Sequence, residues 1–332
     1  MRKTIDQFIF LILLPFILQT IVFYGYNSAY FPYQNLEKLP DYYYTSVYNY
    51  RFLSRDVLEN FGAYLTTFFN QNNFKFKSYL LSKGTPFYHA LFIITTFFMI
   101  LSSISLSRIL KLKTFDKLGE NFKTIFHVLL LLLVAITQYV LTPYDASALF
   151  LFIITACFSI KYIENKSFKN LLIITLLIII STLNRETSSI NLAFLGALLL
   201  TENWQKKENL ISIVKDLSLP VIGFVATYLA VRIFLNNSAG KSLNEGFYLL
   251  QNLTKPNNVF GILFFLIFMK FAYLMSNTAE NKKTITKFIL LCSPYLIMIF
   301  CVGILWETRL FIPIILGSVF IALMNFEKEK LN

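Results

Sequence analysis

The sequence predicts an all-α membrane protein, a polytopic bundle of about ten transmembrane helices in a single domain over residues 1–332. Hydrophobic residues make up 56% of the chain and charged residues only 14%, whereas a soluble domain carries about 25% charged residues. The apolar runs between polar segments are roughly 17 to 20 residues long, enough to cross a hydrocarbon core about 30 Å thick. Lysine-rich and lysine-poor segments alternate along the chain, as insertion into a membrane requires.

Polar or proline-containing turns separate ten apolar runs. The expected spans are residues 7–25, 87–107, 124–142, 145–162, 168–183, 188–202, 217–235, 258–275, 288–305 and 310–326. The first run lacks a small-residue cleavage site after it, so we interpret it as a retained helix. The lysine-rich segments predict that both termini are cytoplasmic. The abundance of Phe, Ile, Asn and Lys indicates an AT-rich genome, which we interpret as bacterial, so the expected location is the cytoplasmic (inner) membrane of a bacterium.

Two outer segments are long enough to fold, residues 26–86 and 236–257. The first contains an expected amphipathic helix over about residues 46–69, in which large apolar residues recur at three- and four-residue spacing. Such a helix would lie in the outer interface with its aromatic face in lipid, or pack over the bundle as a lid. The residues of this aromatic stripe are Tyr50, Leu53, Val57, Phe61, Tyr64 and Phe68.

The net charge of +12 does not indicate a nucleic-acid partner, because basic clusters between apolar spans are what orientation in a membrane requires. All three cysteines fall inside apolar spans, where they behave as small hydrophobic residues. His89 and His127 stand alone at or in apolar helices, and we expect structural roles for both. No cofactor is predicted, and no Cys/His spacing supports a divalent metal.

The arginines are distributed differently from the lysines. Of the 23 lysines, 17 fall on the inner side, whereas five of the seven arginines fall outside or near outer helix ends. Arginine on this face indicates a need for a planar, bidentate donor to phosphate or carboxylate. These five are Arg51, Arg55, Arg185, Arg232 and Arg309.

Carboxylates accompany these arginines. The segments T-P-Y-D, N-R-E-T and W-E-T-R place Asp145, Glu186 and Glu307 at outer helix ends, where ionisable groups face a cavity or pair with one another. Asp41 and Asp56 lie in the first outer loop. Structural alternatives stay open for each of them: a satisfied ion pair, an N-cap by Asp145, a turn at Asp41, or an exposed pair of Arg55 with Glu59.

Together these residues predict a site at the outer face. Carboxylates deprotonate an acceptor hydroxyl, and arginines hold a diphosphate and stabilise its charge as it leaves. This combination suits transfer of a sugar from a lipid-linked donor. The candidate catalytic residues are Asp41, Asp56, Asp145 and Glu186, and the candidate phosphate-binding set is Arg51, Arg55, Arg185, Arg232, Glu307 and Arg309.

The layout resembles the GT-C class of membrane glycosyltransferases, including polymerase-like and EpsG-like proteins of bacterial surface polysaccharide clusters. The resemblance rests on the long first outer loop, the many spans and the N-R-E-T and E-T-R strings. It implies a glycosyltransferase or polymerase of capsule or O-antigen synthesis that uses a polyprenyl-phosphate-linked glycan, with Asp41 or Asp56 as base. The alternatives are a transporter or flippase for a lipid-linked or anionic solute, and a non-catalytic membrane subunit.

Overall fold

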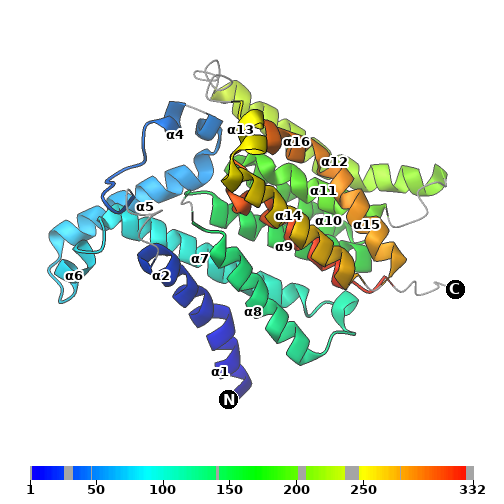
Figure 1. Ribbon diagram of the computed structural model, residues 1–332, viewed down its shortest axis with the longest axis horizontal. Coiled ribbons are helices and arrows are strands. Elements are labelled where there is room, and N and C mark those ends of the chain that lie inside the picture. Colours follow the sequence, from blue (N-terminus) through cyan, green and yellow to red (C-terminus); the bar gives the residue numbers. More distant parts are fainter. Residues whose placement is uncertain are drawn as a thin grey trace.

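The computed structural model describes residues 2–25, 33–45, 47–139, 142–200, 207–235, 247–276 and 278–326. The regular elements in these ranges are all helical, which confirms the predicted all-α class. Figure 1 shows most of the helices packed side by side, with the helices of the first outer loop at one edge. Both extreme ends of the chain, residues 26–32 of the first outer loop and residues 236–246 of the second lie outside the described residues.

Five helices are long and apolar enough to cross a membrane. A sixth span is counted if α15 (Ala279–Leu291) and α16 (Ser293–Val302), which meet at a bend of 50°, form one crossing. The bend falls where Pro294 occupies the first turn of α16 and cannot continue the preceding hydrogen-bond ladder. The five are Ile5–Gly25 (α1, the π-helix η1 and α2), α7 (Pro86–Ile109), α9 (Asp145–Glu164), α12 (Lys207–Phe234) and α14 (Pro256–Met275).

The other expected spans are also helical but shorter. They are α8 (Glu120–Ile136), α10 (Phe168–Asn184), α11 (Ser189–Leu199) and α17 (Ile312–Leu323). At 1.5 Å per residue, none of these four reaches 30 Å on its own. The described residues therefore show five or six helices long enough to cross a membrane, with shorter apolar helices between them, and the count of about ten spans stays a prediction.

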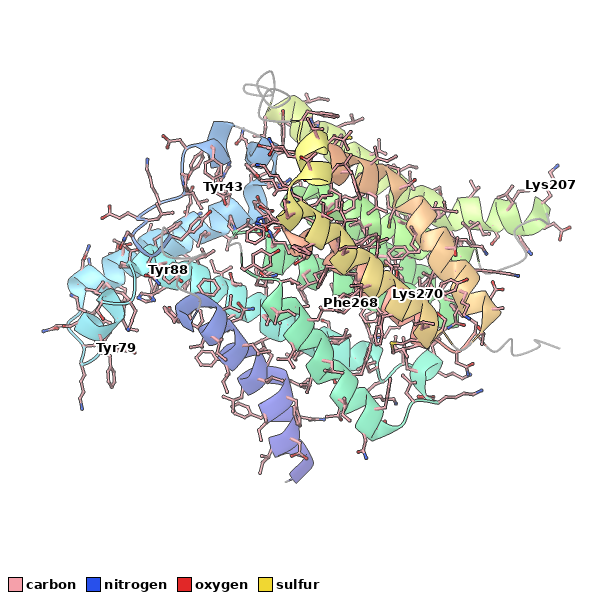
Figure 2. The ribbon with its side chains drawn as sticks, viewed as in Figure 1. Tyr43, Tyr79, Tyr88, Lys207, Phe268 and Lys270 are labelled. Atoms are coloured by element: carbon pink, nitrogen blue, oxygen red, sulfur yellow. The ribbon has the colours of Figure 1, made fainter. Side chains whose placement is uncertain are left out.

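The centre of the bundle consists of helices that are apolar on all sides. Helix α9 packs against α7, α10 and α11, and α17 packs against α14 and α15. Side chains from Ile314 to Leu323 are buried without interruption, as expected for a helix surrounded by protein. By contrast, α12 packs mainly on α10, and its end at Lys207 projects beyond the bundle (Figure 2).

The first outer loop contains α4 (Tyr42–Thr45), the 3-10 turn η2 (Val47–Tyr50), α5 (Phe52–Gln71) and α6 (Lys77–Leu81). Helix α5 lies where the amphipathic helix was expected, but its buried ridge consists of Ser54, Leu58, Gly62 and Phe69. This ridge packs on α7, and a Cβ at Gly62 would lie 2.7 Å from the Phe87 ring. On the aromatic stripe, Val57, Tyr64 and Phe68 are exposed. Helix α5 thus packs on the bundle through Leu58, Phe69 and two small residues, and it turns Val57, Tyr64 and Phe68 outward.

Candidate functional site

Ionised side chains from four segments far apart in the sequence form one network at the expected outer face. Arg51 lies just before α5, and Asp145 begins α9. Arg185 and Glu186 follow α10, and the turn from Glu307 to Arg309 precedes α17. The ion pairs are Arg51 with Glu186, Arg185 with Asp145, Arg309 with Asp145 and Arg309 with Glu307. Six of the ten predicted site residues therefore come together.

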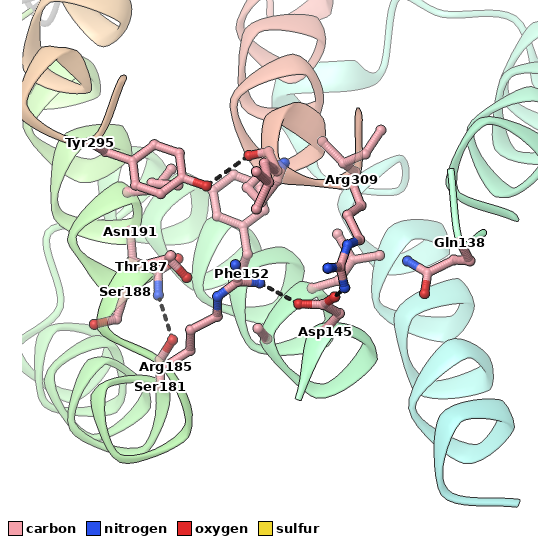
Figure 3. Close-up of a pocket in the computed structure, with 16 residues that line it drawn as sticks. Gln138, Asp145, Phe152, Ser181, Arg185, Thr187, Ser188, Asn191, Tyr295 and Arg309 are labelled. Atoms are coloured by element: carbon pink, nitrogen blue, oxygen red, sulfur yellow. Dashed lines mark hydrogen bonds and ion pairs between the residues drawn. The ribbon is translucent and has the colours of Figure 1, made fainter. Parts of the chain in front are cut away.

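Asp145 is the bridge at the centre of this network. Its Oδ1 accepts a hydrogen bond from Arg185 Nη1, and its Oδ2 accepts one from Arg309 Nη1 (Figure 3). It lies inside the first turn of α9, and Tyr144 occupies the N-cap position without a side-chain cap hydrogen bond. The side chain of Asp145 is 6% exposed. Asp145 thus joins two arginines instead of capping its own helix.

Arg51 and Glu186 form a bidentate pair. Arg51 Nε donates to Glu186 Oε2 at 3.0 Å, and Nη2 donates to Oε1 at 2.5 Å. Burial opposes ionisation of this carboxyl, but the Arg51 guanidinium outweighs burial and lowers the pKa of Glu186 to about 2. Glu186 is therefore an anion at every physiological pH and a weak proton acceptor.

Tyr144 separates the two halves of the network. The guanidinium of Arg51 lies 4.6 Å from the centre of the Tyr144 ring, and that of Arg185 lies 5.4 Å from it. Tyr48 stacks on the same ring at 6.0 Å. An aromatic face attracts a guanidinium, so Tyr144 holds both arginines in place. Tyr144 is the third residue of the T-P-Y-D segment, and we did not predict its role from the sequence.

A buried set of neutral side chains supports the network. Asn184 Oδ1 accepts hydrogen bonds from Ser54 and Ser147, the latter at 3.0 Å, and Asn184 Nδ2 donates to the Tyr144 carbonyl at 3.3 Å. These contacts join α5, α9 and α10. They hold the backbone in place near Arg51, Asp145 and Arg185, because each of these residues lies within three positions of Ser54, Ser147 or Asn184.

Two asparagines hold the turn that carries Glu307 and Arg309. Asn252 Nδ2 donates to the carbonyls of Phe300 and Gly303 at 2.9 and 2.8 Å, and Asn252 Oδ1 accepts from Leu305 N at 3.3 Å. Asn258 Oδ1 accepts from Trp306 N at 3.2 Å. The sequence reasoning missed both residues. An amide beside an apolar span, where a polar group needs a partner, was the available signal.

Glu307 differs from Glu186 in its titration. Burial raises the pKa of Glu307 to about 7, and the positive charges of Arg185 and Arg51 offset this only in part. Arg309 Nη2 donates to Glu307 Oε2 at 2.6 Å, but the same guanidinium also binds Asp145 and Thr142. Arg309 therefore stabilises the ionised form of Glu307 less than it would in an ion pair of these two residues alone. Its side chain is 20% exposed and can exchange a proton with water.

A small polar cavity lies beside the Asp145 bridge (Figure 3). Its volume is about 30 Å³, and its polar walls include Gln138, Ser181 and Asn191. This space accommodates a water molecule but not a sugar ring. A larger ligand would therefore contact the network from the side where Glu186 and Glu307 are partly exposed.

The remaining predicted residues lie outside the network. Arg55 binds Asp56 at 3.0 Å and Asn49 at 2.8 Å, so the carboxylate that pairs with Arg55 is that of Asp56 and not that of Glu59. The Asp41 side chain is 90% exposed, with its carboxylate 3.9 Å from the Lys38 ammonium. Arg232 is exposed and stacks on the rings of Tyr50 and Tyr228, at 4.7 and 4.6 Å.

An apolar groove of about 520 Å³ runs beside Arg232. Its walls come from α12, from the outer end of α10 and from Phe52 at the start of α5. Helix α12 approaches α10 at Gly223, where a Cβ would lie 3.1 Å from Thr175. After Gly223 in α12, Ala226 and Ala230 have side chains too small to fill the space between the two helices.

In the part of the chain that the structure describes, no group of three or more His, Cys, Asp or Glu side chains could hold a metal ion. The chain matches no protein-family model, no curated protein and no solved structure.

Proposed function

We propose that this protein is a membrane glycosyltransferase or polysaccharide polymerase that acts at the outer face on a polyprenyl-phosphate-linked sugar. The proposal includes ten crossings of a bacterial cytoplasmic membrane, with the short helices extended by the turns that adjoin them. The resulting glycan would belong to a cell-surface polysaccharide.

The observation that carries the proposal is the convergence of Arg51, Arg185 and Arg309 with three carboxylates from distant segments. Asp145 is shared by two arginines and Arg309 by two carboxylates, so the guanidinium groups of Arg185 and Arg309 are held close together. Guanidinium groups held in this way suit an anionic ligand of the diphosphate kind, because they donate in a fixed planar geometry.

The groove between α10 and α12 supports a lipid-linked donor. It is apolar, and Arg232 lies on the same part of α12. A polyprenyl chain would occupy the groove, while Arg232 and then Arg51 would bind its phosphates. Tyr50 contacts the Arg232 guanidinium and directly precedes Arg51 in the chain, so the two arginines are neighbours along one path.

In the proposed reaction, the hydroxyl oxygen of the acceptor forms a bond to the anomeric carbon of the donor sugar. The bond from that carbon to the phosphate oxygen breaks, and the polyprenyl phosphate or diphosphate leaves with the electron pair. Glu307 accepts the hydroxyl proton, since its pKa of about 7 suits a base at neutral pH better than that of Glu186. The arginines stabilise the negative charge on the leaving group.

Arg185→Ala and Arg309→Ala test the proposal. Each change removes a group that would bind the leaving phosphate, so we expect at least about 100-fold less glycan formed from a purified polyprenyl-diphosphate sugar. Arg108→Ala is the matched control, because Arg108 is an exposed arginine in the last turn of α7 and does not belong to the charged network. All three variants should reach the membrane in normal amounts. Normal glycan synthesis by both outer variants would refute the proposal.

The bend between α15 and α16 favours a second candidate, a transporter or flippase. Transporters often bind their substrates at broken helices, and this pair is bent by 50° within an otherwise apolar stretch. Proteoliposomes separate the two functions. A transporter would move a lipid-linked sugar between leaflets without changing it, whereas the proposed enzyme would release polyprenyl phosphate or diphosphate.

A further inference from the structure

A second cavity, of about 510 Å³, lies at the opposite end of the bundle from the charged network. It lies between the first helix, the end of α7 and the start of α8 and is open to the surface, and the lysine distribution assigns this end of the bundle to the inner face. Its volume is in the range of small-molecule and lipid head-group pockets. The polar groups along its wall include Asp6, Gln7, Lys111, Lys123, Thr124 and His127.

The π-helix η1 (Ile9–Leu13) shapes this cavity. On the C-terminal side of the π-helix, α2 packs against both α7 and α8. On its N-terminal side, α1 has no comparable packing against α8. Within the π-helix, the Phe10 carbonyl accepts a hydrogen bond from Ser103 Oγ at 3.4 Å, and Ser103 Oγ lies 3.0 Å from His127 Nε2. The inner end of the cavity is therefore polar, and π-helices often occur at functional sites.

Two opposite charges face this cavity without an ion-pair partner. Within the described residues, neither the carboxylate of Asp6 nor the ammonium of Lys111 forms an ion pair, and the two do not pair with each other. The other acid and base in the wall are already paired, because Lys123 Nζ lies 2.9 Å from Glu120 Oε1. A ligand that carries one positive and one negative group would satisfy both Asp6 and Lys111.

We propose that the cavity binds the head group of one phosphatidylethanolamine molecule from the inner leaflet. Its primary ammonium donates to Asp6, and its phosphate accepts from Lys111. The acyl chains leave between the first helix and α8, along Phe10 and Leu11. Asp6 and Lys111 are both exposed. A choline head group offers Asp6 no N–H donor, and an anionic head group offers it no cation. The pairing of charges thus selects a zwitterionic lipid with a primary amine.

The test uses the purified, delipidated full-length protein and native mass spectrometry. It is titrated with phosphatidylethanolamine, phosphatidylcholine and phosphatidylglycerol that have identical acyl chains. We expect one bound phosphatidylethanolamine, held about fivefold more tightly than either other lipid, as one additional charge contact of about 1 kcal/mol gives. Equal binding of all three lipids would overturn the proposal.

Two variants test whether Asp6 binds the ammonium and Lys111 binds the phosphate of the head group. Asp6→Asn should weaken phosphatidylethanolamine about fivefold and leave phosphatidylglycerol unchanged, whereas Lys111→Met should weaken both lipids by a similar factor. Lys169→Met is the matched control, since Lys169 is an exposed lysine at the start of α10, outside the cavity. The proposal fails if either wall variant binds lipid as the control does.

A third variant protects the test against misfolding. Ser107→Trp adds volume to the cavity wall without changing a charge, and it should abolish the single tight phosphatidylethanolamine. Helix content by circular dichroism and elution on size-exclusion chromatography must match the unaltered protein for each variant used. A properly folded Ser107→Trp protein that keeps the tight lipid would overturn the proposal.

Discussion

Glu186 and Glu307 belong to one network, yet their environments shift their pKa values in opposite directions. Arg51 neutralises Glu186 with two parallel hydrogen bonds, and the pKa falls to about 2. Glu307 is buried beside a guanidinium that also binds Asp145, and its pKa rises to about 7. Two carboxyls with pKa values shifted apart in this way are suited to different tasks, one as a fixed anion and one as a proton acceptor.

The first prediction concerns Glu307. If Glu307 is the base, it must be ionised before it accepts a proton, so glycan formation should rise as the pH increases through about 7 and level off above it. Glu307→Gln should lower the rate at least about 100-fold and remove this dependence. The measurement is the initial rate with purified donor between pH 5.5 and 8.5. A Gln variant that keeps the same rise with pH would exclude Glu307 as the base.

The second prediction concerns the stability that Glu186 contributes. Its pKa is lower in the folded protein than the ordinary value of 4.5, so its stabilising effect is present above pH 4.5 and is lost as the pH falls toward 2. Glu186→Gln should unfold at a lower temperature than the unaltered protein at pH 6. The difference should shrink by pH 3, as thermal unfolding in detergent would show. A constant difference would contradict the assigned pKa.

At the scale of single elements, the positions of the helices could be predicted better than their faces. Apolar run lengths located the helices, because the membrane requires long stretches without charge. The aromatic stripe of α5 did not identify its buried side, since Ser54 and Gly62 allow a closer approach to α7 than large rings would. Periodicity in a lipid-exposed helix does not distinguish the side that meets protein from the side that meets lipid.

The third prediction concerns the contact between α14 and the turn that carries Glu307. A Cβ at Gly261 would overlap the backbone of Leu305, so Gly261→Ala must displace that turn. We expect a loss of about 1 to 3 kcal/mol in stability and reduced glycan formation. Gly119→Ala is the matched control, because a Cβ there would meet nothing within 4 Å. Equal thermal stability of the two variants would show that α14 does not restrain the turn.

At the scale of the whole molecule, the lysine distribution predicted which charged residues share a face, but it could not predict which of them pair. Arg51 and Glu186 lie 135 positions apart, and nothing in either local sequence specifies the other. The neutral residues that align the segments were not predicted either: Asn184 ends α10 and Asn252 lies in the short helix α13 (Leu249–Thr254), and asparagine at such positions usually indicates a turn or cap. Their importance depends on burial, which only the packed bundle determines.

The fourth prediction tests orientation. In a variant without the native cysteines, a cysteine at the exposed Ser82, in the first outer loop, should react with a membrane-impermeant maleimide in intact cells. A cysteine at the exposed Asn165, after α9, should react only once the membrane is permeabilised. Labelling of the second position in intact cells would reverse the assignment of the faces.

The packing of α5 links the charged network to the outside of the bundle. One side of this helix rests on α7 through Gly62, the other presents Tyr64 and Phe68 outward, and the chain just before its first turn carries Arg51. If α5 lies in the outer interface as predicted, a change in lateral pressure or lipid composition that tilts α5 about its contact at Gly62 would move Arg51 relative to Glu186. The affinity for the proposed anionic ligand would then respond to the physical state of the outer leaflet.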